Sequence, residues 1–308
     1  MQPILLALVG IGKIARDQHL PAIAGNPAFK LAATVSRNEP GVEGVPHAKT
    51  LDALLETDAK FDAVVLCTPP QVRYTLAHQA LSRGYHVFLE KPPGATLSEV
   101  EALREEADKR RVTLFASWHS RYAPGVEPAR AWLSDRKIAH VKVTWREDVR
   151  VWHPGQKWIW QPGGLGVFDP GINALSILTH ILPQSFFLTQ TTLLVPENRA
   201  APIAALIEFR DALGTPISAD FDFRQTGPQS WDIEVETDDG ALKLSSGGAI
   251  LRLPTGTHSE QEREYPSLYN RFEMLIRNGD SDVDVRPLRH VADAFLRGDI
   301  KKVEPFYD

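Results

Sequence analysis

The first third of the chain alternates short, continuous apolar runs with segments of helical periodicity. Apolar runs of this length are typical of strands that are buried on both faces of a parallel sheet. One helix is expected after Pro69, with Val72, Leu76 and Ala80 on its inner face, and another after a capping box at Thr96. Strands that alternate with helices predict a doubly wound α/β fold. The expected strands lie at 4–9, 31–35, 61–68, 86–89 and 112–116.

From about residue 119 the pattern changes to strands with few helices between them. Ile217, Ala219 and Phe221 alternate with polar residues, so one face of their strand is apolar and the other polar. Asp239 and Gly240 are typical of a hairpin turn between two such runs. This half is therefore expected to be an α+β domain with a mostly antiparallel sheet and two late amphipathic helices, at 268–276 and 288–296. The expected strands lie near 138–149, 186–195, 202–209, 217–223, 231–237 and 241–253.

The composition narrows the class of protein. The 308 residues are 43% hydrophobic and 24% charged, which is ordinary for a soluble globular protein of two domains. A formal net charge of −5 without a basic block argues against nucleic acid as a partner. Cys67 is the only cysteine, so an internal disulfide is excluded and a cytoplasmic location is expected. The N-terminus lacks the basic segment of a signal peptide, and no apolar stretch is long enough to span a membrane.

A glycine motif follows the first apolar run directly. Gly10, Gly12 and Ala15 match the pattern G-x-G-x-x-A of dinucleotide-binding turns. Gly10 permits the tight turn, Gly12 lets the main chain approach a pyrophosphate, and the small Ala15 allows close packing of helix on strand. The N-terminus of the following helix would point at the phosphates. The pattern predicts a dinucleotide site, and the alternative is a glycine-rich turn without a ligand.

The residues after the second expected strand bear on the choice of dinucleotide. An acidic residue near this position would bind the ribose 2′-hydroxyl of NAD, but Ser36 and Arg37 stand there instead. A serine hydroxyl and a guanidinium suit a 2′-phosphate, so NADP is expected as the preferred cofactor, with NAD accepted. The alternative is a solvated arginine in a turn.

Lys91 follows the apolar run 86–89 and precedes two prolines that end the strand. The residue before a proline is held in extended geometry, so Lys91 is expected at the carboxyl end of the strand, where open parallel sheets bind their ligands. A lysine in this place could take up or deliver a proton. The alternative is a surface lysine that closes a strand.

A second candidate for chemistry lies in the glycine-rich segment 163–173. Asp169 is expected to cap a helix, with Pro170 at its first position. Asp169 and Asn173 would then lie near one another on one face of that helix, because they are four residues apart. The alternative is a plain cap followed by a solvated asparagine.

Several aromatic and titratable residues precede this segment. Trp152 could provide the apolar floor of a sugar site, but packing in a core or an interface explains a tryptophan equally well. His153 is either a hydrogen-bonding partner of a ligand or a satisfied structural residue. Glu147 shares a strand face with Trp145, and an acid on the apolar face needs a partner, for which Lys91 is a candidate.

The order of four motifs resembles the glucose–fructose oxidoreductase, inositol dehydrogenase and MocA (Gfo/Idh/MocA) family along nearly the whole chain. The motifs are Gly10-x-Gly12-x-x-Ala15, Thr68-Pro69-Pro70, Glu90-Lys91-Pro92, and Gly163-Gly164 leading to Asp169-Pro170-Gly171. The resemblance implies a Rossmann domain, a domain with an open-faced antiparallel sheet, and homo-oligomers that form through that open face. The implied domains are a dinucleotide-binding domain at 1–118, a substrate-binding and oligomerisation domain at 119–284, and a final helix at 285–308 that packs back on the first domain.

One departure from the family is informative. The family usually has a histidine at the position of Asn173, and asparagine cannot carry a proton at neutral pH, so proton transfer shifts to Lys91 and Asp169. Together with the tryptophan–histidine motifs at 118–121 and 152–155, this departure resembles the bacterial L-arabinose/D-galactose 1-dehydrogenase branch. The resemblance implies NAD(P)-dependent oxidation of an aldopyranose at C1 to a lactone, without a metal.

The site residues that follow from these motifs and the resemblance form three groups. Lys91 and Asp169 are expected to be catalytic, and which of them takes the proton stays open. Sugar contacts are expected from His119, Glu147, Trp152, His153 and Asn173. Dinucleotide contacts are expected from Gly10, Gly12, Lys13, Ile14, Ser36, Arg37, Thr68, Pro69, Glu90 and Lys91. The alternatives are oxidation of inositol or another sugar within the family, and a non-catalytic regulator that binds NADP.

Overall fold

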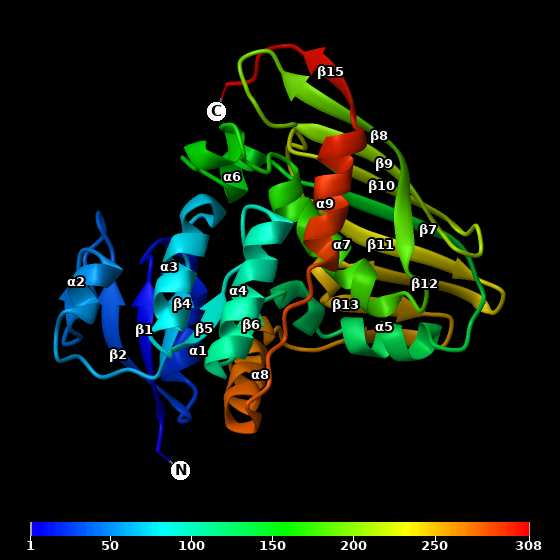
Figure 1. Cartoon of the computed structure of the whole chain (residues 1–308). Coiled ribbons are helices and arrows are strands. Elements are labelled where there is room, and N and C mark those ends of the chain that lie inside the picture. The colour runs from blue at the N-terminus through cyan, green and yellow to red at the C-terminus, as the bar shows by residue number, and fades with distance from the viewer. Residues whose placement is uncertain (1, 308) are drawn as a thin grey trace. The chain divides into compact units, whose positions relative to one another are not determined.

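The computed structural model describes residues 2–307, which divide into two compact units, each made of two segments of the chain (Figure 1). The first unit contains the chain up to His119 and the segment Glu264–Val285. The second unit contains Ser120–Arg263 and the residues from Arg286 onward. The first division therefore falls one residue from the expected boundary.

The first unit is built on a parallel sheet, which confirms the doubly wound fold expected for this half. Its strands are β1 (Ile4–Val9), β2 (Phe29–Val35), β3 (His47–Ala48), β4 (Ala63–Leu66), β5 (His86–Leu89) and β6 (Leu114–Ala116). Among the described residues the strand order is β3-β2-β1-β4-β5-β6, and every neighbouring pair is parallel. β4 and β6 are buried along their whole length, since their apolar side chains leave from both faces of the sheet.

Helices cover both faces of this sheet. They are the π-helical turn η1 (Ala15–His19), α1 (Leu20–Ala24), α2 (Leu51–Leu55), α3 (Pro70–Ser82), α4 (Leu97–Arg110) and α8 (Glu264–Asn278). α2, α3 and α4 share one apolar cluster with Val87 and Leu89 of β5, whereas Tyr269 of α8 packs on Phe88, whose side chain points to the other face. The capping box expected for α4 is confirmed, because Thr96 and Glu99 each bind the main-chain N–H of the other.

The inner face of α3 differs from the expected one. Val72 is 49% exposed, whereas Arg73, Ala77 and Ala80 are buried. The expected stripe was wrong at Val72 because an arginine occupies the inward position next to it, and an arginine is normally assigned to the surface. The main-chain acceptors that make this burial possible are described below.

The second unit contains a large mixed sheet. Its strands are β7 (Ile138–Arg146), β8 (Phe186–Pro196), β9 (Ala204–Asp211), β10 (Pro216–Asp222), β11 (Ser230–Thr237), β12 (Gly240–Ser245), β13 (Ile250–Leu253), β14 (Gly256–Ser259) and β15 (Asp299–Val303). Within residues 2–307 their order is β14-β13-β12-β11-β7-β10-β9-β8-β15. The pairs β7–β10 and β8–β15 are parallel and the other pairs are antiparallel, so the expected, mostly antiparallel sheet is confirmed.

The expected strand at 241–253 is two strands in the structure. A short turn, η4 (Ser246–Gly248), separates β12 from β13. Ser246, Gly247 and Gly248 have φ values of 51°, 70° and 99°, whereas the regular strand conformation has a negative φ. The apolar pattern continues through the turn, so periodicity alone did not reveal the break.

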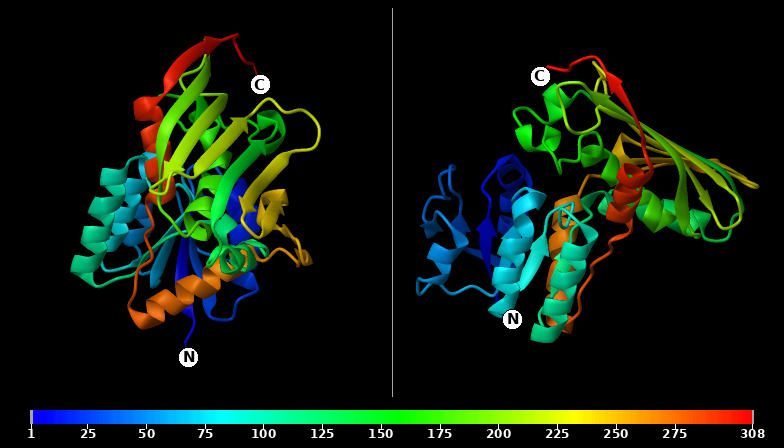
Figure 2. Two further views of the ribbon diagram at one scale, coloured as in Figure 1. Left: turned by 90° about the vertical axis from the view of Figure 1, so that its right-hand side faces the viewer. Right: turned by 45° about the horizontal axis from the view of Figure 1, so that its top comes forward.

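Helices pack on one face of the second sheet, as the views in Figure 2 show. α5 (Val126–Leu133), α7 (Phe168–Ile181) and α9 (Arg286–Arg297) contact its strands. The other helices of this part of the chain are short: α6 (Val149–Trp152), η3 (Lys157–Trp160) and η2 (His119–Tyr122), which crosses the boundary between the units. α7 comes close to β10 at Gly171, where a Cβ atom would stand 2.6 Å from the ring of Phe221. On the opposite face Leu206 is 52% and Phe187 55% exposed.

The late segment of the chain that belongs to the first unit is 264–285, and not the expected 285–308. α8, which starts at Glu264, belongs to the first unit, while α9 and β15 belong to the second. The expectation for 285–308 was wrong because Phe295 of α9 packs on Phe168 of α7, and β15 pairs with β8. Among the described residues no helix is long and apolar enough to cross a membrane.

Candidate functional site

The carboxyl edge of the first sheet gathers the residues that are predicted to bind a dinucleotide. Gly10, Ser36, Thr68 and Glu90 follow β1, β2, β4 and β5, either directly or after one further residue. Because these strands are neighbours in the sheet, the residues after them lie side by side. The structure therefore brings together Gly10, Gly12, Lys13, Ile14, Ser36, Arg37, Thr68, Pro69, Glu90 and Lys91.

The turn after β1 has the geometry that a bound pyrophosphate needs. Gly10 has a φ of 92°, and a Cβ atom there would stand 3.0 Å from the main-chain carbon of Cys67. A Cβ atom on Gly12 would meet nothing within 4 Å, so the space over the start of the following helix is open. The side-chain hydroxyl of Thr68 is buried and has no hydrogen-bond partner among the described residues. An open helix N-terminus beside an unsatisfied hydroxyl fits a phosphate-bearing ligand.

The loop after β2 is held in part by Arg16, from the helix that follows the glycine turn. The hydroxyl of Ser36 accepts the main-chain N–H of Glu39 at 3.2 Å. Arg16, from the helix after the glycine turn, donates to the carbonyl of Pro40 at 2.9 Å and lies 4.0 Å from the Glu39 carboxylate. Arg37 follows Ser36 in this loop and is exposed. Of the two acids in the loop, Glu39 and Glu43, Glu39 is thus turned toward Arg16.

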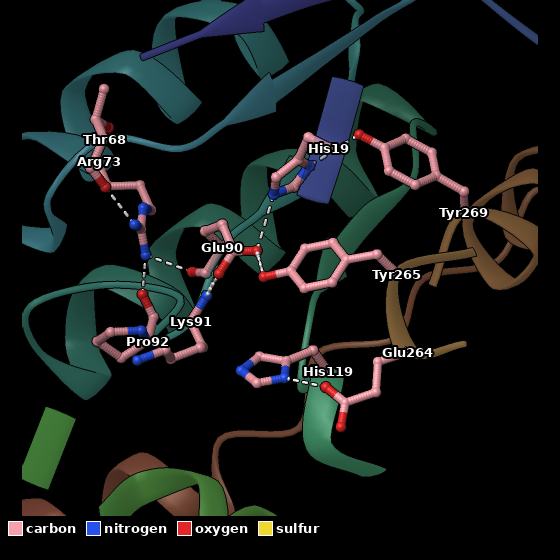
Figure 3. Close-up of polar contacts among 10 residues, drawn as sticks. All are labelled: His19, Thr68, Arg73, Glu90, Lys91, Pro92, His119, Glu264, Tyr265 and Tyr269. Carbon is pink, nitrogen blue, oxygen red and sulfur yellow. Dashed lines mark hydrogen bonds and ion pairs between the residues drawn. The ribbon is translucent and has the colours of Figure 1, made fainter. Parts of the chain in front are cut away.

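Lys91 stands after β5, as the sequence predicts, and the carboxylate of Glu90 holds its main chain. Oε2 of Glu90 accepts the main-chain N–H of Lys91 at 2.9 Å. Oε1 binds Nε2 of His19 and the hydroxyl of Tyr265, both at 2.9 Å (Figure 3). Burial raises the pKa of Glu90, but the hydrogen bond and charge of His19, with Tyr265, outweigh it and bring the pKa to about 2. Glu90 is therefore ionised at neutral pH although it is only 4% exposed.

His119 follows β6 at the same edge and pairs with a residue that the sequence did not single out. Nδ1 of His119 donates to Oε2 of Glu264, the first residue of α8 (Figure 3). Burial lowers the pKa of His119, but the charge and hydrogen bond of Glu264 outweigh it, so the pKa is raised above 6.5. The charge of Glu90 adds to this rise and that of Lys91 opposes it. The ring also lies 5.7 Å from the ring of Tyr265.

The other predicted residues belong to the second unit, where a buried carboxylate is again the centre. Glu147 follows β7 and is 2% exposed. Its Oε1 binds Nε2 of His153, and its Oε2 accepts the indole N–H of Trp231, both at 2.9 Å. Nδ1 of His153 lies 3.3 Å from Oδ2 of Asp169. Within the unit, therefore, Glu147 finds its partners in His153 and Trp231.

Asp169 lies inside its helix and does not cap it. α7 begins at Phe168, so Asp169 and Pro170 occupy the second and third positions, and the residue before the helix, Val167, makes no side-chain cap. The expected cap was wrong because the turn 163–167 enters the helix with its main chain already helical at Val167. Asp169 is only 4% exposed. Asn173 follows one helical turn later on the same face, as expected.

The tryptophans near this cluster divide into two kinds. Trp152 is 41% exposed, and its ring centroid is 4.8 Å from that of Trp231. Trp160 is buried and packs on Phe223, so its role is in the core. Trp231 lies in β11, directly opposite Trp145 of β7. Trp152 and Trp231 are therefore placed to offer aromatic surface next to Glu147.

A metal site needs several side-chain ligands that lie close together. Among residues 2–307 no group of three or more histidine, cysteine, aspartate or glutamate side chains could hold an ion. The buried carboxylates of Glu90 and Glu147 are instead hydrogen-bonded to side chains: Glu90 to His19 and Tyr265, and Glu147 to His153 and Trp231.

Comparisons with known proteins agree with this geometry. A family model described as an oxidoreductase family with an NAD-binding Rossmann fold matches residues 4–117. A galactose 1-dehydrogenase from Pseudomonas fluorescens is 47% identical over 311 aligned positions, and the match covers 100% of both chains. The chain belongs to the Gfo/Idh/MocA oxidoreductase family.

Solved structures are similar to this Gfo/Idh/MocA chain along its whole length. The crystal structure of a D-galactose-1-dehydrogenase from Rhizobium etli is 61% identical, with a TM-score of 0.96 and coverage of 100% of this chain and 99% of that one. A 3-ketoreductase from Actinomadura kijaniata, solved with NADP and TDP-benzene, is 17% identical, with a TM-score of 0.84 and coverage of 98% and 99%. The second likeness concerns the fold alone. The first unit of this family member is thus an NAD-binding Rossmann unit, and the protein is an oxidoreductase.

The pairing of His119 with Glu264 generates a prediction about pH. Glu264→Gln removes the charge that raises the pKa of His119, so the pKa of His119 is expected to fall, as followed by NMR titration of the ring protons. A raised histidine pKa stabilises the fold fully below about pH 6.5 and loses this effect as pH rises through the folded-state pKa. The loss of unfolding free energy in the variant is therefore expected to be larger at about pH 6 than at about pH 8.5.

The matched control is Glu260→Gln. Glu260 is 70% exposed and lies 3.6 Å from Nε2 of His258, so its removal is expected to change stability little at either pH. An unchanged pKa of His119 in Glu264→Gln, or an equal loss of stability at both pH values, would contradict the pairing.

Proposed function

We propose that this oxidoreductase is an NAD(P)-dependent aldose 1-dehydrogenase that oxidises an aldopyranose, such as D-galactose or L-arabinose, at C1 to the lactone. The observation that carries the proposal is the cluster of Glu147, His153 and Asp169 beside the indoles of Trp152 and Trp231. Oriented polar groups next to an aromatic plane suit a sugar ring, which has hydroxyls at its edge and an apolar face. Full-length similarity to galactose 1-dehydrogenases supports the same substrate class.

Lys91 and Asp169 are proposed to handle the proton of the anomeric hydroxyl. A bound nicotinamide would supply the hydride acceptor for C1. Glu147 only accepts hydrogen bonds when ionised, so Nε2 of His153 carries the proton of that bond and Nδ1 turns a lone pair toward the carboxylate of Asp169 in the neutral ring. The two atoms lie 3.3 Å apart, so the imidazole and the carboxylate offer neighbouring acceptor atoms for the proton of the anomeric hydroxyl.

Recognition of the sugar is assigned to side chains around this proton site. His153 and Glu147 are oriented by their mutual hydrogen bond, and a hydroxyl that matches them is selected sharply because an unmatched buried group is costly. Asn173, one turn after Asp169, both donates and accepts hydrogen bonds. Trp152 offers its exposed ring as a platform. His119 of the first unit is proposed as a further sugar contact.

NADP is proposed as the preferred dinucleotide, with NAD accepted. The open turn at Gly12 and the first helical residues Lys13 and Ile14 would hold the pyrophosphate, with Thr68, Pro69 and Glu90 on the neighbouring strand ends. Ser36 and Arg37 would bind the 2′-phosphate, because the nearby Glu39 is turned toward Arg16 and Arg37 is exposed in the same loop.

The open face of the second sheet is proposed to bind a second copy of the chain. Leu206 on β9 and Phe187 on β8 point outward, and their exposed fractions are 52% and 55%. Apolar side chains of this size on a broad strand surface are typical of protein–protein contacts.

The substrate class is tested with the purified protein, NADP and a panel of D-galactose, L-arabinose, myo-inositol and an aldose phosphate. Reduced nicotinamide is expected to form with the two aldoses, as followed by its absorbance, and the product is expected to be the lactone. Lys91→Ala and Asp169→Asn should each lower kcat/KM by roughly 10²–10⁴-fold, because each removes a group proposed to move the proton.

Lys109→Ala is the matched control, since the Lys109 side chain is 72% exposed near the C-terminal end of α4 and is not among the residues proposed to bind a ligand. Dinucleotide binding, measured separately by fluorescence, is expected to persist in Asp169→Asn. Full turnover in Lys91→Ala would sink the assignment of the lysine. Oxidation of inositol without any oxidation of aldoses would favour a different member of the family.

The cofactor preference is tested with Arg37→Ala. Loss of a charge-assisted contact is worth roughly 1.5–3 kcal/mol, so the Kd for NADP is expected to rise about 10-fold to 100-fold while the Kd for NAD changes little. Arg83→Ala, which removes an exposed arginine near the end of α3, serves as control. Equal losses for the two dinucleotides would count against a 2′-phosphate contact.

The oligomer is tested by light scattering after size-exclusion chromatography. The wild-type protein is expected to have a mass that is a multiple of the 34.2 kDa chain, and Leu206→Asp is expected to lower it, because a carboxylate cannot be buried in an apolar contact without a partner. Leu213→Asp is the control, since Leu213 is 77% exposed in the loop after β9. A single-chain mass for the wild type would rule out the proposed contact.

A further inference from the structure

Arg73 is a buried charge that the proposed chemistry does not use. It lies on the inner face of α3 and is 2% exposed, on the side of the helix that also buries Ala77 and Ala80. A guanidinium removed from water is costly unless its N–H groups are hydrogen-bonded. Its acceptors therefore indicate why the chain keeps an arginine at this place.

The guanidinium of Arg73 binds main-chain carbonyls at the ends of two neighbouring strands. Nη2 donates to the carbonyl of Thr68, which follows β4, and Nη1 donates to the carbonyls of Glu90 and Pro92, which follow β5 (Figure 3). One rigid, planar group thus links the strand end proposed to contact the dinucleotide with the segment that carries Lys91. A lysine at position 73 would offer a compact ammonium in place of this fork.

The peptide group between Glu90 and Lys91 is held on both sides. Its carbonyl accepts from Arg73, and its N–H donates to Oε2 of the Glu90 side chain at 2.9 Å. The carboxylate of Glu90 is itself fixed at Oε1 by His19 and Tyr265. The main chain on either side of Lys91 is therefore tied to α3, to the helix after the glycine turn and to α8.

The two charges that hold this peptide group are opposite. The pKa of Glu90 is lowered to about 2 despite its burial, chiefly by His19, so Glu90 is an anion across the range in which enzymes work. Arg73 remains a cation in proteins. Both charges also act on Cys67, whose thiol pKa is raised by burial and by Glu90 and lowered by Arg73. The carbonyl and the N–H of one peptide group thus each face the charge that suits them.

We propose that Arg73 is the positioning residue for Lys91: its guanidinium fixes the 90–92 segment on the Thr68 strand end and so sets the direction in which the Lys91 side chain leaves the sheet. The inference rests on the proposed function in so far as Lys91 acts on a sugar. Placement of the main chain of the 90–92 segment by Arg73 does not depend on the substrate.

Misplacing a reacting group by about 1 Å costs on the order of 10²-fold in rate. Arg73→Met, which keeps the length and the apolar stem but has no donors, is expected to lower kcat about 100-fold. Arg73→Lys, which restores a charge and donors without the fork, is expected to lower kcat about 10-fold. In Arg73→Lys the Kd for the dinucleotide and the KM for the sugar are expected to stay within about threefold, because the lysine keeps the positive charge and the proposed binding groups themselves are unchanged.

A second readout does not involve turnover. In the ligand-free protein, hydrogen exchange followed by mass spectrometry is expected to accelerate about 10-fold or more in peptides that cover 89–94 when Arg73 is replaced by Met, since the Lys91 N–H loses its fixed partner geometry. Peptides from the second unit should be unchanged. Arg136→Met is the matched control, because Arg136 also donates to a main-chain carbonyl, that of Trp132, but lies far from Lys91 in the sequence and in the other unit.

The outcomes separate this inference from the proposed function. Unchanged kcat in Arg73→Met, with an active wild type, would overturn the inference. Equal loss in Arg73→Met and Arg73→Lys, together with an equal fall in Tm, would overturn it as well, because the arginine would then serve stability alone. If Arg73→Met does not fold, Arg73→Lys decides through its kcat at unchanged KM and Tm. A wild type that oxidises no aldose would refute the proposed function, and the hydrogen-exchange result would still test the positioning.

Discussion

A buried carboxylate needs partners, and the need of Glu90 for partners organises the first unit. Removing such an anion from water costs several kcal/mol unless hydrogen bonds replace the lost hydration. The donors come from separate segments: His19 from the helix after the glycine turn, Tyr265 from α8, and the main chain of Lys91. Because the folded-state pKa of Glu90 is about 2, this stabilisation is present above about pH 4.5 and is lost as pH falls toward 2. Since an ionised Glu90 only accepts, Nε2 of His19 donates to it, and Nδ1 of His19 lies 2.9 Å from the hydroxyl of Tyr269.

The second unit solves the same problem with different donors. Glu147 is as buried as Glu90, and it orients His153 and Trp231 in the way that Glu90 fixes the main chain of Lys91. In each unit a carboxylate that does not itself need to react sets the tautomer or the direction of groups proposed to do so. This arrangement gives polar groups fixed directions before a ligand arrives, which lowers the cost of ordering them on binding.

The residues at the carboxyl edge of the first sheet could be predicted from the sequence, because glycine and proline mark the ends of its strands. Gly10 and Lys91 follow apolar runs that end in glycine or proline, and parallel strands bring such ends to one edge. The partners of the buried groups could not be predicted in this way. Tyr265 is 175 residues from Glu90 in the sequence, and its position on α8 indicates only that it belongs to the apolar face of that helix. The burial of Arg73 could not be predicted either, because a charged residue in a helical pattern indicates the exposed face, and the sequence does not show that carbonyls from two strand ends converge there.

These long-range partners explain why the Rossmann unit of this chain is made of two segments. All strands of the first sheet lie before residue 119 in the sequence. The partners of Glu90 and His119, Tyr265 and Glu264, however, come from a segment that follows most of the second unit in the chain. Trp118 likewise donates its indole N–H to the carbonyl of Asp284 at 2.8 Å. Each of these groups, left without its partner, would cost about 1–3 kcal/mol. A unit that ended at residue 119 would therefore hold the glycine turn and the lysine yet lack the hydrogen bonds that give them a single geometry, so α8 belongs to the site as much as to the fold.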